Sequence, residues 1–339
     1  MRYGSATIGL SMATLLALGA AAGVARADDA ATGDVKQAQV AQEGSSIEAT
    51  PGRTESPALE LQTPSQEKEK KVQEGSAAET QNARAATLEG SKSAWSGQLQ
   101  FTYMGSTLND PFAKTVPNPS GQAEPLPVEL TGVVALRYRL SDTLTAGFGT
   151  GFTSITPFQG QQHTTVADPQ VDVAKSFMIG PIHNRIDTTL IWLTSYAEMI
   201  GYGEGVNLDI TDESFYEWNW GGTLGLALEY DFYTLRNDVP DAVRPNQLIQ
   251  DYLIMPYAEY AFNDKWNLRT IIHFTTNQLR GLPQGKWQHP DVTQNLGIGY
   301  APTKAVFLYL YGQFDPYSKT VPLAADTTTV GLQAIINLF

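Results

Sequence analysis

The sequence contains no cysteine and comparatively few charged residues. Of its 339 residues 17% are charged, and the formal net charge is −13. Without cysteine the chain has no disulfide, no thiolate metal site and no cysteine nucleophile. An excess of acids also argues against nucleic acid as a partner, because phosphate recognition needs a basic surface. No cofactor is predicted from any motif in the chain.

Long apolar runs and helical periodicity are also missing from the body of the chain. Beyond the N-terminal segment no run of about 18 apolar residues occurs, so no transmembrane helix is expected there. With 42% hydrophobic residues, the chain is nevertheless too apolar to be disordered throughout. Its 30 glycines and 15 tyrosines favour strands and turns over helices.

Residues 1–27 have the features of a secretory signal peptide. Arg2 precedes an apolar stretch over residues 8–24, and Ala-Arg-Ala at 25–27 has the small-x-small form that signal peptidase cleaves. An anchoring helix is the alternative, but the stretch is short, contains glycine and is followed by an acidic pair. Since no cysteine follows, a lipoprotein anchor is excluded.

Residues 28–92 differ from both flanking regions in composition. They are rich in Ala, Glu, Gln, Ser, Thr and Lys and have almost no aromatic or branched residue from which to build a core. Such a segment cannot bury enough apolar surface to offset its ordering entropy. The composition predicts a disordered periplasmic lead, which could also tether the protein to a periplasmic partner.

Residues 93–339 alternate between apolar and polar side chains in segment after segment. In 128–140, for example, Leu130, Val134 and Leu136 fall on one face, while Glu129 and Arg137 fall on the other. A period of two is typical of a β-strand with one apolar and one polar side. We therefore predict an all-β domain over 93–339. A soluble sandwich would alternate as well, so the connections decide between the two architectures.

Short and long connections alternate along this domain. Tight turns are predicted at 141–142, 180–181, 221–222, 263–264 and 302–303, and long connections at 105–127, 155–165, 198–212, 235–250, 277–289 and 315–326. Turns on one side and loops on the other are typical of an antiparallel up-and-down transmembrane β-barrel. Eleven connections join twelve strands, or about 21 residues per strand and connection, which suits a spanning strand of 9–11 residues. The weakest strand, near 208–220, is acidic, so ten or fourteen strands stay open.

Aromatic residues and the C-terminus fit the same class. Aromatics fall near predicted strand ends, where a bilayer places its headgroups: Trp95, Tyr103, Tyr138, Tyr196, Tyr216, Trp218, Trp220, Trp266 and Tyr300. The last strand alternates up to Phe339 and thereby resembles the C-terminal signature of Gram-negative outer-membrane β-barrels of the porin-like class, although Asn337 stands where an aromatic is common. The resemblance implies an outer-membrane location, contact with outer-membrane lipids, and Phe339 as the signal for the barrel-assembly machinery.

Strand parity also predicts which side chains line the lumen. Taking the polar face of each strand, acids outnumber bases by ten to four. The predicted lumen residues are Glu129, Arg137, Arg139, Asp168, Asp172, Arg185, Asp187, Glu217, Glu229, Asp231, Glu259, Arg269, His273, Asp291 and Asp315. Their charges could form ion-pair networks that fill a narrow barrel, or they could line a selective passage.

No catalytic or metal-binding constellation is predicted. A lipid-modifying barrel needs Ser and His on its lipid-facing surface, whereas His273 shares the parity of Arg269 and points to the lumen. His289 and Asp291 are too few for a metal site. The sequence therefore predicts a non-enzymatic channel or porin for small solutes, with a preference for cations. A non-conducting structural or surface-display barrel is the alternative, and a lipid-modifying enzyme is a third hypothesis.

Overall fold

The structure is a computed structural model that describes residues 93–116, 126–158, 163–194, 203–241, 243–283, 285–288, 291–317 and 324–338. The predicted signal peptide (1–27), the predicted lead (28–92) and the predicted assembly signal at Phe339 lie outside the described residues. Those predictions therefore stay predictions.

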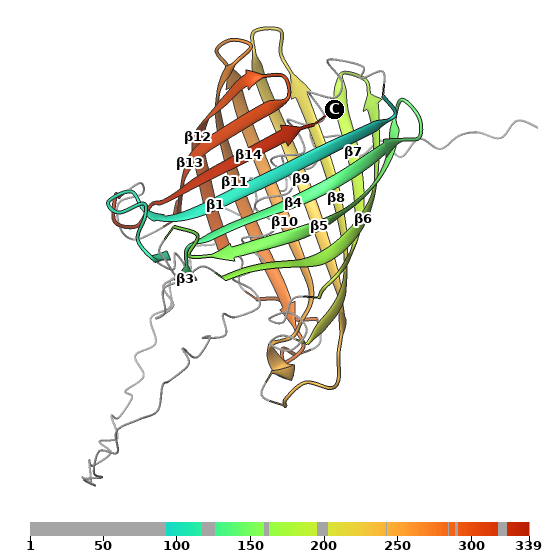
Figure 1. Ribbon diagram of the computed structural model, residues 1–339, viewed down its shortest axis with the longest axis vertical. Coiled ribbons are helices and arrows are strands. Elements are labelled where there is room, and N and C mark those ends of the chain that lie inside the picture. Colours follow the sequence, from blue (N-terminus) through green and yellow to red (C-terminus); the bar gives the residue numbers. More distant parts are fainter. Residues whose placement is uncertain are drawn as a thin grey trace, which may run out of the picture. The chain divides into compact units, whose positions relative to one another are not determined.

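The domain is a closed antiparallel β-barrel of twelve strands (Figure 1). The strands are β1 (Trp95–Thr107), β4 (Glu129–Arg139), β5 (Leu144–Ile155), β6 (His163–Ile179), β7 (Ile182–Trp192), β8 (Glu204–Glu217), β9 (Gly222–Leu235), β10 (Leu248–Ala261), β11 (Trp266–Leu279), β12 (Asp291–Thr303), β13 (Val306–Phe314) and β14 (Thr329–Asn337). Each strand pairs with its neighbour in sequence, and β1 closes the barrel by pairing with β14. The predicted architecture and strand number are confirmed.

Minor elements lie in two of the long connections. β2 (Thr115–Val116) and β3 (Leu126–Pro127) form a short ribbon between β1 and β4, and a single 3-10 turn, η2 (Arg244–Asn246), lies between β9 and β10. None of the helical segments within the described ranges is long and apolar enough to cross a membrane.

Tight turns and long connections alternate as predicted, with two shifts. The sixth strand, β8, begins at Glu204 and ends at Glu217, so it starts about four residues earlier than the alternation suggested. β12 continues through the predicted turn, and Lys304 and Ala305 form the connection to β13 instead. In both places backbone pairing with the neighbouring strand extends past the point where the side-chain pattern weakens.

Alternation sorts the side chains of each strand into an inner and an outer set. In β9 the side chains of Ala227, Glu229 and Asp231 are buried, whereas those of Leu224 and Phe232 are about 40% exposed or more. Since successive side chains point to opposite faces, the buried set faces the barrel interior and the exposed set faces outward. The same division holds in β8, β10 and β11.

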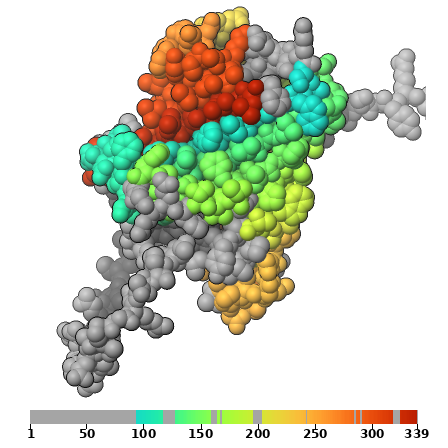
Figure 2. Space-filling model, in the orientation of Figure 1, coloured from blue at the N-terminus to red at the C-terminus, as the bar shows by residue number. Residues whose placement is uncertain are grey.

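The outer face carries an apolar belt with aromatic residues at one end. Figure 2 shows the outer face of β1, β4, β13 and β14 as one continuous surface. At the tight-turn end, ring centroids lie 4.8 Å apart in the pair Trp95 and Tyr138 and 4.3 Å apart in the pair Trp266 and Tyr300. Tyr103 lies at the other end, beneath Phe158, and Tyr196 is outside the described residues. Apolar outer belts bounded by aromatics suit a bilayer.

Candidate functional site

The barrel interior is the part of the molecule where charge and polarity concentrate. Among the described residues, nine acids are buried but only two arginines, Arg185 and Arg269. The nine acids are Glu129, Asp172, Asp187, Glu204, Glu213, Glu229, Asp231, Asp251 and Glu259. Buried charges are costly unless they are paired, hydrogen-bonded or neutralised by an ion, so their surroundings decide what the interior can do.

Most of the predicted lumen residues share this interior. Buried on inward faces are Glu129, Asp172, Arg185, Asp187, Glu229, Asp231, Glu259, Arg269 and His273, and the half-buried Arg137 and Arg139 share the inward face of β4. The remaining four differ. Asp168 lies at an irregularity where β6 shifts register against β5, and it has a positive φ of 59°. Glu217 and Asp291 are exposed at strand ends, and Asp315 follows the end of β13.

The backbone irregularity at Asp168 takes its side chain out of the regular inward-facing set of β6. Its side-chain Oδ1 accepts a hydrogen bond from the Thr194 backbone N–H (2.9 Å), and its own N–H donates to Thr194 Oγ1 (2.8 Å). The pair ties β6 to the segment after β7. The bulge is the reason that simple parity does not describe this residue, because an extra residue in one strand reverses the alternation beyond it.

An ion pair crosses β5 from β4 to β6. Arg137 Nε lies 3.5 Å from Asp172 Oδ2, and both residues are register partners of Gly147, which lies between them. A side chain at 147 would meet the Asp172 carboxylate, so the glycine leaves the room in which the two charges approach each other. Asp172 is 3% exposed, and Arg137 therefore neutralises a carboxylate that water barely reaches.

Replacing Arg137 with alanine is expected to destabilise the barrel more than replacing Asp172 with asparagine. The first change leaves a buried carboxylate without this partner and should cost about 3 kcal/mol; the second leaves a half-buried guanidinium that can hydrate and should cost about 1 kcal/mol. Equilibrium urea unfolding in phospholipid vesicles measures both. Equal losses, or a larger loss for Asp172→Asn, would contradict the assignment of Asp172 as the more deeply buried partner.

A second ion pair lies on β7. Arg185 and Asp187 are two residues apart and therefore share a face, and Arg185 Nη2 lies 2.6 Å from Asp187 Oδ2. Both side chains are buried. This ion pair and the Arg137 pair both lie on β4 to β7, while on the other wall the buried Arg269 of β11 is the register partner of Glu259 on β10.

In the wall formed by β8 to β11, hydrogen bonds and a cation–π contact join the charged side chains to their neighbours. Tyr257 on β10 lies over Gly225 of β9, and its hydroxyl donates to Glu213 Oε1 on β8 (2.9 Å). The Arg269 guanidinium lies 5.1 Å from the Tyr257 ring centroid, a cation–π arrangement. The adjacent Glu259 accepts a hydrogen bond from Asn267 Nδ2 (3.0 Å).

His273 is part of this polar lining and has the surroundings of a structural residue. It is 1% exposed on the inward face of β11, and its Nε2 lies 3.4 Å from Asn295 Nδ2. A lipid-modifying barrel would need its histidine on the outer surface. The buried, inward position of His273 therefore does not support the hypothesis of a lipid-modifying enzyme.

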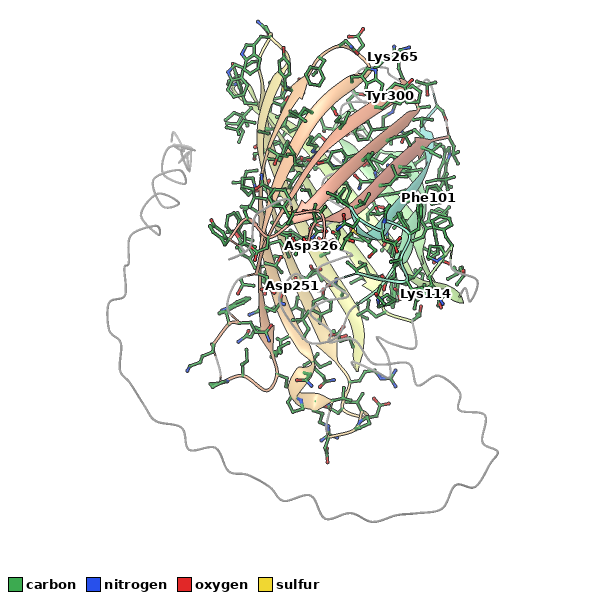
Figure 3. All side chains as sticks on the ribbon, turned by 90° about the vertical axis from the view of Figure 1, so that its left-hand side faces the viewer. Phe101, Lys114, Asp251, Lys265, Tyr300 and Asp326 are labelled. Atoms are coloured by element: carbon green, nitrogen blue, oxygen red, sulfur yellow. The ribbon has the colours of Figure 1, made fainter. Side chains whose placement is uncertain are left out.

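Carboxylates gather most densely on β8 and β9. Carboxylate oxygens of Asp209, Glu229 and Asp231 all lie within 4.8 Å of one another. In register, Asp209 lies opposite Asp231, and Asp231 lies opposite Asp251 on β10. Figure 3 labels Asp251 on this wall, well away from Lys265 at the tight-turn end. We refer to Asp209, Glu229 and Asp231 as the acidic cluster.

The connection between β9 and β10 is fastened close to this cluster. Gln247 is fully buried, and its Nε2 donates to the carbonyls of Gly203 (2.8 Å) and Arg236 (3.0 Å). Arg280 Nη1 in turn donates to Gln247 Oε1 (2.7 Å). In the connection itself, the hydrogen bond from Arg236 holds the pKa of the exposed Asp238 carboxyl below its usual value. The described part of the connection between β9 and β10 is therefore ordered by hydrogen bonds.

The sequence pattern missed several interior acids. Asp209, Glu213 and Asp251 were not among the predicted lumen residues, although Asp209 and Glu213 share the parity of Glu217, and Asp251 shares that of Glu259. Asp209 and Glu213 lie within the strand predicted near 208–220, and applying parity to that whole strand would have found them. Asp251 directly follows the long connection predicted over 235–250, so starting that strand at residue 251 would have found it.

These features define a closed β-barrel with a charged interior. No protein-family model and no curated protein sequence matches the chain. Among solved structures, the COG4313 outer membrane channel from Pseudomonas putida F1 is similar at 13% identity, over 73% of this chain and 97% of that one, with a TM-score of 0.49.

Two further solved structures are similar to a lower degree. The KdgM porin matches at 10% identity over 71% of this chain and 99% of its own, with a TM-score of 0.40. The NanC porin matches at 8% identity over 72% of this chain and 100% of its own, with a TM-score of 0.41. Such values are too low to carry a solute or a residue role from those proteins to this chain.

Proposed function

We propose that the barrel spans the outer membrane of a Gram-negative cell and conducts small solutes, with a preference for cations over anions. The observation that supports the proposal is the interior charge, nine buried acids against two buried arginines among the described residues. The apolar outer belt and its aromatic boundary provide the lipid-facing surface that such a barrel needs.

An excess of carboxylates in a confined passage favours cations for an electrostatic reason. Low-dielectric walls focus the field of fixed charges into the lumen, which concentrates ions of opposite sign and repels ions of like sign. The ion pairs on β4 to β7 cancel part of the charge there. The β8 to β10 wall, with the acidic cluster and Asp251, is then the stretch that a passing cation encounters as negative.

Reconstitution into a planar bilayer tests the proposal. Under a salt gradient the reversal potential should have the sign of a cation-selective channel, and the preference should weaken as salt rises. The reason is screening, since the Debye length falls from about 10 Å at 0.1 M to about 3 Å at 1 M. An anion-selective current would contradict the proposed selectivity, and a silent membrane containing correctly folded protein would contradict the channel itself.

A second candidate function, a non-conducting structural barrel, is favoured by one observation. Leu253, Met255 and Ile271 point inward and are at most 2% exposed, in a cluster with Phe215 and Tyr257. An apolar cluster of this kind fills interior volume and stabilises the wall. Conductance measurement separates the two functions, and assays of phospholipid and lipid A turnover address the enzyme hypothesis.

A further inference from the structure

The acidic cluster combines features that a channel wall does not require. We propose that Asp209, Glu229 and Asp231, together with the amide oxygen of Asn207, bind a divalent cation of the calcium type on the inner wall of β8 and β9. The site goes beyond ion passage, because it would hold one ion as part of the folded barrel.

Geometry brings the ligand atoms to one point. Asp209 and Asp231 are register partners on neighbouring strands, and Glu229 lies two residues from Asp231 on the same face. Their carboxylate oxygens fall within 4.8 Å of one another. Ca²⁺ takes six to eight oxygen ligands at about 2.4 Å in flexible geometry, whereas Mg²⁺ demands near-ideal octahedral geometry at about 2.1 Å, so a group of carboxylates on two strands suits Ca²⁺ better.

Two buried oxygen atoms at this place have no hydrogen-bond donor. Asp231 is 1% exposed, and its Oδ2 has no hydrogen bond; Asn207 is 6% exposed, and its Oδ1 has none. The opposite atoms of both side chains are joined, since Asn207 Nδ2 donates to Asp231 Oδ1 (2.6 Å). Buried acceptors without donors are costly and rare in folded proteins. A cation bound between the two side chains would satisfy both oxygens at once, and the Tyr233 hydroxyl, 3.3 Å from Asn207 Nδ2, places a further oxygen beside them.

Register adds an electrostatic reason for a bound ion. Asp209, Asp231 and Asp251 form a row across three adjacent strands, each directly opposite the next. Like charges in directly opposed positions, with Cβ atoms about 5 Å apart, destabilise a sheet. The hydrogen bond from Thr211 Oγ1 to Asp209 Oδ1 (3.1 Å) comes from a neutral hydroxyl and does not cancel charge. A divalent cation removes the repulsion and binds the strands together.

The test is calcium binding to the full-length mature protein, folded in detergent and stripped with EDTA. Equilibrium dialysis with radioactive calcium should find one ion per barrel with a Kd of roughly 10⁻⁵ to 10⁻³ M, in the range of calcium sites that work at micromolar to millimolar calcium. The temperature of unfolding should rise with calcium concentration, because a ligand that binds only the folded state stabilises it. Magnesium at equal concentration should give a smaller rise.

Substitutions separate this site from adventitious binding. Asp209→Asn and Asp231→Asn keep the side-chain volume and each should weaken calcium binding at least tenfold, while raising the unfolding temperature in EDTA because repulsion is relieved. Glu217→Gln is the matched control, since Glu217 lies on the same face of β8 but is exposed at its tight-turn end. It should leave calcium binding unchanged.

Three results would overturn the site: no calcium bound by the wild-type barrel, equal binding by Asp231→Asn, or loss of binding in Glu217→Gln. Because binding is measured in detergent without any current, it is independent of conduction. Calcium binding by a barrel that is silent in bilayers would keep the site and overturn the channel. Conduction by a barrel that binds no calcium would overturn the site alone.

Discussion

Replacing Gly225 with valine is expected to prevent normal folding of the barrel. Gly225 and Tyr257 are direct partners on β9 and β10, and the tyrosine ring lies over the glycine, where a Cβ atom would overlap it. The ring would have to move, and its hydrogen bond to Glu213 (2.9 Å) and its contact with Arg269 would be lost with it. Overpacking together with a buried acceptor left without its donor should cost about 4 kcal/mol.

The heat-modifiable gel shift of folded barrels and urea unfolding in vesicles measure this loss. Tyr257→Ala supplies the control, since it removes the ring that valine would meet. Valine at 225 in that background should cost less than half of what it costs in the wild type, as expected for two residues in contact. A Gly225→Val barrel that is as stable as the wild type would show that the ring does not lie on the glycine.

The order of the strands could be predicted from the sequence because the physics is local. A strand with one face toward lipid and one toward a polar interior must alternate, and a tight antiparallel turn needs turn residues at its tip. The turn residue is evident at Gly180, whose positive φ of 59° suits the connection of β6 to β7. Strand ends were less certain, since β8 keeps its backbone pairing where its side chains become acidic.

The interior site could be predicted only in part, because parity gives the face of a residue and not its partner. Arg137 and Asp172 were both placed inside, but their contact depends on the register of β4, β5 and β6. The same is true of Tyr257 and Glu213, which belong to strands that are not adjacent. The register of the strands depends on how the whole barrel closes, so it cannot be read from any short stretch of sequence.

Acidic composition was the signal most easily misinterpreted. A run that includes Asp209, Asp212, Glu213 and Glu217 resembles a solvated loop, yet β8 spans the barrel and turns Asp209 and Glu213 inward. A strand can carry such charges when its inner face meets hydrogen-bond donors, water or ions in place of lipid. Of these charges, Asp209 and Glu213 face the interior and are among the acids on which the proposed function depends, whereas Asp212 lies on the outer face and Glu217 is exposed at the strand end.

Neutralising Glu229 and Asp231 together is expected to remove most of the preference for cations. A carboxylate about 5 Å from a passing monovalent cation attracts it by about 0.8 kcal/mol in a water-filled passage, so the pair contributes about 1.6 kcal/mol. Since about 1.4 kcal/mol is a factor of ten and the pair repels anions as it attracts cations, the cation-to-anion permeability ratio at 0.1 M salt should fall by at least about an order of magnitude. Glutamine and asparagine keep the side-chain volumes, so the width of the passage is unchanged.

Reversal potentials in planar bilayers with EDTA present measure this effect without a bound divalent ion. Glu217→Gln again serves as the control, because it removes an exposed charge at the strand end and should change the ratio far less. At 1 M salt the wild type and the double variant should converge, because charges farther apart than about 3 Å are then screened. A double variant that stays as cation-selective as the wild type at 0.1 M would move the source of selectivity away from β9, to the remaining buried acids of the interior.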